Sequence, residues 1–270
     1  MAEWSGWFFD LYEDPQGGVI LWLLADSGER VRLRQAFPIT FYAAGPAERL
    51  RALWRWLESQ PLPVRLAREE RRDLFLPHPV TVLAVEVPCA AHQPRLFRQA
   101  ARDFGDLTFY DADIPLALRH AARYGTFPLA RCRVRAANGG EVQALQVLDT
   151  PWELDPSPAP LRGLELEPDC DPAHAEPRYL LARFERCAYR FALDAPRPLL
   201  VNLRALLQKH DPDMLLTAWG DTWLLPRLLE MSRAAGLALP LNREPGRDAA
   251  QRAQRTYFSY GQIIYRGQQV

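Results

Sequence analysis

Long apolar runs, closely spaced cysteines and a surplus of either charge are all missing from this chain of 270 residues. No apolar run approaches the ~20 residues of a membrane-spanning helix. The first residues carry no basic segment ahead of an apolar run, so a signal peptide is not expected. Acidic and basic residues number 33 each, so the net charge is zero and predicts no bulk attraction to nucleic acid.

Cysteine and glycine motifs are also absent. The four cysteines are scattered and form no C-x-x-C pair, which argues against a zinc site: Cys89, Cys132, Cys170 and Cys187. Neither a glycine-rich phosphate loop nor a Gly-x-Ser-x-Gly elbow occurs. We therefore expect a soluble cytoplasmic protein with reduced thiols. Hydrophobic residues make up 48% of the chain, which predicts a folded core.

The apolar pattern predicts two domains of mixed α and β structure. Residues 6–44 alternate between apolar runs and turns, which predicts a β-meander. Residues 46–60 form an amphipathic helix, and a β-α-β order at about 80–135 suggests a ferredoxin-like unit. The Pro-rich stretch 151–160 separates residues 1–155 from residues 156–270. The second part alternates strand and helix, an α/β pattern.

Four stretches, in order, resemble the N-terminal part of family B DNA polymerases of the elongation-subunit type. They are GWFFDLYEDPQGGVILWLLADSGERVRLRQAFPITFYAAG, LTFYDADIPLALRHAARYGTFPLA, DPDMLLTAWGDTWLLPRLLEMSRAAGL and TYFSYGQIIYR. The resemblance implies an N-terminal domain followed by part of an RNase H-like 3′→5′ exonuclease domain with a mixed sheet. It also implies that the third exonuclease motif and the polymerase palm lie beyond Val270, so we expect no polymerization chemistry in these residues.

The resemblance implies a metal-dependent nuclease site. Enzymes of this family hold two Mg²⁺ or Mn²⁺ ions with carboxylates, beginning with an Asp-x-Glu pair on a strand. The matching stretch here, LRGLELEPD, offers Glu165 and Glu167, which share one face of a strand. Glu at the Asp place would shift the ligand by about an ångström, which can cost on the order of 10²-fold in rate. The alternative is that both glutamates form a solvated strand face.

The second exonuclease motif of the family, Asn-x-x-x-Phe-Asp, is altered at this place in the sequence. Trp219 takes the Asn place, Trp223 the Phe place and Leu224 the Asp place. Leu cannot bind a metal ion. Asp221 lies three residues earlier and could act as a substitute ligand or, as the favoured alternative, as the N-cap of the helix that follows.

Basic and aromatic residues near the C-terminus suggest contacts with single-stranded DNA. Arg252 and Arg255 precede Tyr257 and Tyr260, and this combination suits phosphate contacts and base stacking. The alternative places the aromatic residues in the core. The charged run VRLAREERRDL reads as a solvated segment, and His120 as part of a solvated helix face.

Three functions of different classes follow from these patterns. The favoured one is a DNA-binding scaffold with a silent exonuclease site, serving a polymerase domain on a longer chain, with no membrane partner. The second is an active exonuclease that uses Glu165, Glu167 and Asp221 with Mg²⁺ or Mn²⁺. The third is an unrelated α/β interaction protein, which the order of the four stretches disfavours.

Overall fold

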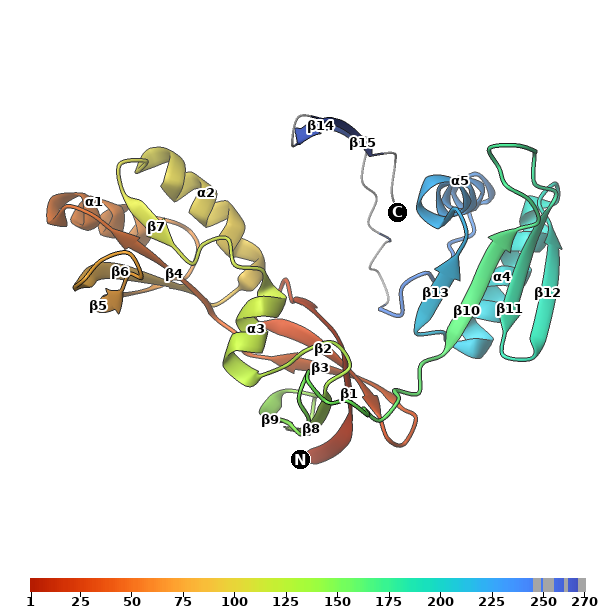
Figure 1. The fold of residues 1–270 in the computed structure, drawn as a ribbon, viewed down its shortest axis with the longest axis horizontal. Coiled ribbons are helices and arrows are strands. Elements are labelled where there is room, and N and C mark those ends of the chain that lie inside the picture. Colours follow the sequence, from red (N-terminus) through yellow and green to blue (C-terminus); the bar gives the residue numbers. More distant parts are fainter. Residues whose placement is uncertain (245–248, 250–254, 260–261, 267–270) are drawn as a thin grey trace. The chain divides into compact units, whose positions relative to one another are not determined.

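The chain forms two compact units in the computed structural model, Met1–Pro160 and Leu161–Val270 (Figure 1). The structure describes the following residues: 1–244, 249, 255–259 and 262–266. Of the helices in these residues, none is long and apolar enough to cross a bilayer.

The first unit extends beyond residue 155, where the sequence places the domain boundary, because two hydrogen bonds attach the connecting segment to it. The indole Nε1 of Trp7 donates to the carbonyl of Ser157 at 3.1 Å. The guanidinium of Arg30 donates to the carbonyl of Pro160 at 2.8 Å. The boundary therefore falls at the end of the Pro-rich stretch.

The first sheet of this unit has the strand order β3-β2-β1-β8-β9, with antiparallel neighbours throughout. Its strands are β1 (Ala2–Glu13), β2 (Val19–Ala25), β3 (Arg30–Gln35), β8 (Arg131–Ala136) and β9 (Val142–Val147). In β3, Val31 and Leu33 are buried while the arginines that alternate with them are not, the alternation of a half-buried strand. The predicted meander therefore holds for β1, β2 and β3, but its fourth strand joins another sheet.

The second sheet of this unit contains a β-α-β-β-α-β order, the arrangement of a ferredoxin-like unit. Its elements are β4 (Ile39–Ala44), α1 (Ala47–Glu58), β5 (Arg65–Arg72), β6 (Pro79–Val87), α2 (Gln93–Asp103) and β7 (Thr108–Tyr110). The strand order is β5-β6-β4-β7, again antiparallel. Both helices pack on one face, where Leu53 and Leu96 join Phe41 and Val85 in a buried cluster.

The sequence misplaced this ferredoxin-like unit, which spans 39–110 rather than about 80–135. The run VRLAREERRDL contains β5 but shows no strand pattern. Charged residues occupy both faces of this strand, which lies at the edge of the sheet. The strand β8, expected in the unit, pairs instead with β1 in the first sheet. Strand propensity cannot reveal which sheet a strand will join.

His120 is fully buried, contrary to the prediction of a solvated face. It lies on α3 (Leu116–Tyr124), which ends at Gly125 as the sequence predicts. Its Nδ1 is 2.7 Å from Thr126 Oγ1 and its Nε2 is 2.9 Å from Gln35 Oε1. The ring of Phe8 stacks on it. Both ring nitrogens have partners inside the core, so burial costs this side chain no hydrogen bond.

The second unit is built on a mixed sheet with the order β12-β11-β10-β13. Its strands are β10 (Gly163–Pro168), β11 (Tyr179–Phe184), β12 (Cys187–Ala192) and β13 (Met214–Thr217). β10 and β13 are parallel, and the other neighbours are antiparallel. Leucines of α4 (Pro196–His210) and α5 (Leu225–Ala235) share one buried cluster with the sheet. Two further strands, β14 (Arg255–Ser259) and β15 (Gln262–Arg266), form a hairpin.

Acidification should destabilise the fold through His120. Burial, with a smaller contribution from Arg123, lowers the pKa of His120 from 6.5 to about 4. Below about pH 6.5 the unfolded chain binds a proton at this residue, whereas the folded chain does not until about pH 4. The free energy of unfolding should therefore fall by about 2 kcal/mol from this residue between about pH 7 and about pH 4.5. Urea unfolding at both pH values measures the change.

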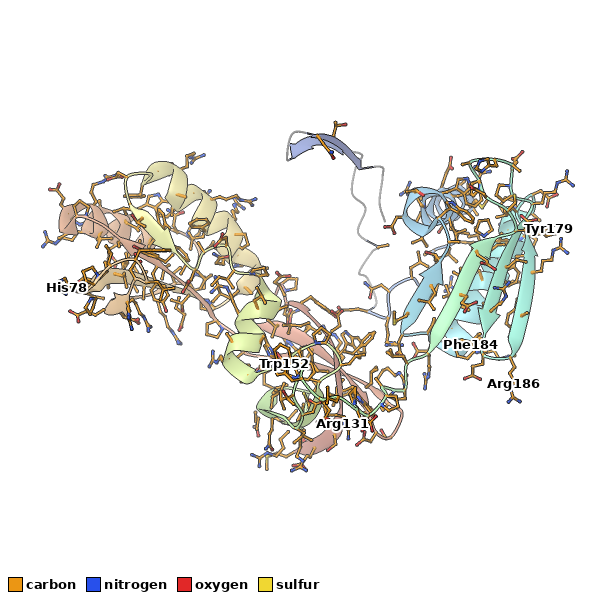
Figure 2. All side chains as sticks on the ribbon, in the orientation of Figure 1. His78, Arg131, Trp152, Tyr179, Phe184 and Arg186 are labelled. Atoms are coloured by element: carbon orange, nitrogen blue, oxygen red, sulfur yellow. The ribbon has the colours of Figure 1, made fainter. Side chains whose placement is uncertain are left out.

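The matched variants are His120→Gln and His78→Gln. His78, labelled in Figure 2, is exposed, so its replacement should leave the pH dependence as in the wild type. His120→Gln should weaken the pH dependence by about the amount given above. Equal pH dependence in all three proteins would contradict the role of His120.

Candidate exonuclease site

The strand β10 presents Glu165 and Glu167 on one face and two leucines on the other. Leu164 and Leu166 are fully buried against the helices, while the side chains of Glu165 and Glu167 are 52% and 35% exposed. The alternation follows from the two-residue period of a strand. The two carboxylates therefore lie close together on the face opposite the helices.

A guanidinium from the neighbouring strand contacts both of these carboxylates. Arg183 on β11 lies directly opposite Glu165 in the strand register. Its Nη1 is 2.7 Å from Glu167 Oε1 and 3.5 Å from Glu165 Oε2. Figure 2 labels Tyr179 and Phe184, which mark the two ends of this strand. Arg183 thus supplies a positive charge in contact with both glutamates, a role that the sequence pattern did not predict.

The strand β13 leads into a tight turn that only glycine fits. A Cβ on Gly220 would lie 1.8 Å from Thr217 Oγ1, far inside contact distance. Trp219, just before it, has the left-handed backbone that is uncommon for residues other than glycine (φ 52°). Its carbonyl accepts hydrogen bonds from the backbone amides of Trp223 and Leu224. This closes one π-helical turn, Gly220–Leu224, which runs into α5.

Leu224, at the place of the family's aspartate, belongs to the core. It is fully buried and shares the apolar cluster of Leu164, Leu228 and Met231. Trp223 packs against the same cluster and is partly buried. Trp219 at the Asn place is 42% exposed. The altered motif therefore contributes apolar packing where the family places polar ligands.

Asp221 is exposed in the first turn of the π-helical segment. The prediction that it caps a helix is wrong, because neither the π-helical turn nor α5 has a side-chain hydrogen bond at its start. Within the described residues, no three His, Cys, Asp or Glu side chains lie close enough to share a metal ion. Among the described residues, Asp221 is therefore not grouped with Glu165 and Glu167, and these three side chains do not form a shared carboxylate site.

The predicted DNA-contacting residues lie mostly outside the described residues. Arg252 and Tyr260 fall there entirely, and Arg255 and Tyr257 are described only through the backbone of β14. Arg243, which precedes them, has a structural role. It donates to Asp211 at 2.7 Å and to the buried Asp213 at 2.9 Å, and so attaches the segment after α5 to the turn before β13.

No family model matches the sequence, and no curated protein matches it. Among solved structures, the family B DNA polymerase of Pyrobaculum calidifontis matches with a TM-score of 0.67 over 88% of this chain. The chain has the fold of part of a family B DNA polymerase. The two chains are 23% identical, and this chain covers 33% of the polymerase, about a third of its length.

The similarity to the polymerase confirms the resemblance of the four sequence stretches at the level of fold. It does so without a sequence match, which places the likeness in the arrangement of strands and helices.

Restoring the family's acid at residue 224 should destabilise the second unit. Leu224→Asp would place a carboxylate in the apolar cluster beneath the sheet, and we expect it to lower the free energy of unfolding by at least about 3 kcal/mol. Val201→Asp on α4, whose side chain is 50% exposed, is the matched control and should change stability by less than about 1 kcal/mol. Urea unfolding measures both. A Leu224→Asp protein as stable as the wild type, and stabilised further by Mg²⁺, would contradict the burial of this position.

Proposed function

We propose that this chain is a DNA-binding scaffold equivalent to the N-terminal and exonuclease regions of a family B DNA polymerase, with a silent exonuclease site. One observation carries the proposal: Arg183 contacts Glu165 and Glu167 while Leu224 is buried in the core. In this proposal the scaffold serves a polymerase domain on a longer chain, and it binds a single-stranded 3′ end or template.

The RNase H-like assignment of the second unit is part of this proposal. Three antiparallel strands, β12, β11 and β10, are extended by the parallel β13, so the sheet is mixed. One helix connects β12 to β13 and another follows β13. A mixed sheet of this kind after residue 160 is what the polymerase resemblance requires.

The charges on the sheet favour an inactive nuclease site over a catalytic one. Two-metal phosphodiester cleavage needs several carboxylates that converge on the ions, which activate water and stabilise the leaving oxygen. Here the two convergent carboxylates already contact a cation, and the third place in the motif is apolar. Exposed ion pairs of this kind contribute little to stability, typically below about 1 kcal/mol. The main effect of Arg183 in this proposal is therefore to neutralise the negative charge of Glu165 and Glu167.

The alternative function is an active exonuclease that uses Glu165, Glu167 and Asp221 with Mg²⁺ or Mn²⁺. One observation favours it: the side chain of Asp221 is exposed and makes no hydrogen bond or ion pair to any other described residue. The alternative requires Asp221 to approach the two glutamates and a metal ion to displace Arg183 from them.

A nuclease assay separates the two functions. The protein is incubated with 3′-labelled single-stranded DNA and either Mg²⁺ or Mn²⁺, beside Glu165→Ala/Glu167→Ala and Arg183→Ala. We expect no shortening above background in any of the three proteins. Removing Arg183 uncovers the glutamates but supplies no third ligand, so Arg183→Ala should gain no activity. Metal-dependent shortening that the double alanine variant loses would establish the alternative.

The scaffold part of the proposal has a separate readout. Fluorescence anisotropy with a labelled single-stranded oligonucleotide should show binding that weakens as salt rises, because phosphate contacts release counterions. Absence of binding at low salt would refute the scaffold role whatever the nuclease assay shows.

A further inference from the structure

A groove in the first unit runs between α1 and the strands β5 and β6. It has a volume of about 650 Å³, within the usual range for ligand sites. Its apolar part comes from Leu50, Trp54 and Leu83. Its charged part comes from Arg51, Arg55, Arg68 and one acid, Glu58. Figure 1 shows the three elements that form it.

The side chains of the three arginines of the groove are exposed and make no hydrogen bond or ion pair to any described residue. Neighbouring arginines behave differently: Arg49 pairs with Asp106 at 2.5 Å, and Arg65 pairs with Glu86 at 3.2 Å. Three cations against a single carboxylate give the groove a net positive charge. The charge complementarity therefore points to an anionic occupant.

The spacing of the arginines suits a chain of anions. Arg51 and Arg55 are four residues apart on α1, so they lie on the same face with Cβ atoms about 5–6 Å apart. Arg68 approaches from β5, the strand on the other side of the groove. Cations on both walls can contact successive phosphates of one strand.

Trp54 supplies an aromatic surface between these cations. It is partly buried against the apolar cluster of the second sheet. The other tryptophan of α1, Trp56, contacts the ring of Phe104 edge to face with centroids 5.8 Å apart. No such ring contact is found for Trp54 in the described residues. An aromatic side chain beside basic residues in a groove is the combination by which proteins bind single strands.

We propose that this groove binds single-stranded nucleic acid, with its phosphates on Arg51, Arg55 and Arg68 and a base stacked on Trp54. The inference rests on the proposed DNA-binding function and gives it a location on the first unit, whereas the glutamates of β10 belong to the second. An acidic protein segment would match the charges of the groove, but it carries no bases to stack on Trp54.

Anisotropy with a fluorescent oligothymidylate tests the arginines. In Arg51→Ala/Arg55→Ala/Arg68→Ala, the slope of log Kd against log salt should fall by about 2, at about 0.7 for each single-strand phosphate contact. The control Arg95→Ala/Arg98→Ala/Arg135→Ala removes three exposed arginines of the same unit that do not line the groove. It should retain the wild-type slope. Equal loss in both variants would overturn the location while leaving DNA binding intact.

Trp54→Leu tests stacking, with Trp56→Leu as its control and circular dichroism to verify that both remain folded. Trp54→Leu should weaken binding by about five- to a hundred-fold, the usual range for losing one stacked base. Trp56→Leu should leave it within about twofold. Unchanged affinity in Trp54→Leu would overturn the stacking contact.

Two further outcomes distinguish the alternatives. A wild-type protein that binds polyglutamate more tightly than oligothymidylate, with the preference lost in the groove variant, would replace the nucleic acid by an acidic protein partner. A wild-type protein that binds no oligonucleotide at low salt would refute both this inference and the proposed scaffold function.

Discussion

The apolar layer between the mixed sheet and its two helices is the constraint on which the second unit depends. Leu164 and Leu166 face this layer, which forces the residues between and beyond them, Glu165 and Glu167, to the opposite face. Leu224, which follows β13, is buried in the same layer. The need to bury these leucines thus leaves Glu165 and Glu167 on the exposed face and fills position 224 with an apolar side chain. The position of the charges is a consequence of where the leucines must lie.

Local patterns in the sequence were sufficient to predict the elements with strong periodicity. The strand of Glu165 and Glu167 and the helix ended by Gly125 follow from spacing and side-chain chemistry alone. The left-handed Trp219 and the closeness of Gly220 to Thr217 follow from the path of the backbone, which no periodicity encodes. Asp221 was expected to cap a helix because of its residue type, but the π-helical turn leaves its side chain without that hydrogen bond.

Contacts between distant segments were beyond the reach of the sequence pattern. His120 lies beside arginines on its helix and was therefore expected to be solvated. Its burial depends on Gln35, which lies 85 positions earlier in the chain. Arg183 contacts the two glutamates only because β11 pairs with β10 in one register. In each case the contacting residue comes from another helix or strand. The sequence pattern of one segment alone does not predict which distant residue it will contact.

The charges of β5 have a consequence for how this protein behaves at high concentration. β5 is the outer strand of its sheet, and one side of its backbone has no partner strand among the described residues. An unpaired strand edge is a template onto which another chain can add, and this is a common route to aggregation. β5 carries four arginines and two glutamates, and charged side chains along an edge strand oppose the addition of another strand. At the opposite edge, β7 is only three residues long and offers little to pair with. The charged run therefore protects against self-association between sheets, whatever else it binds.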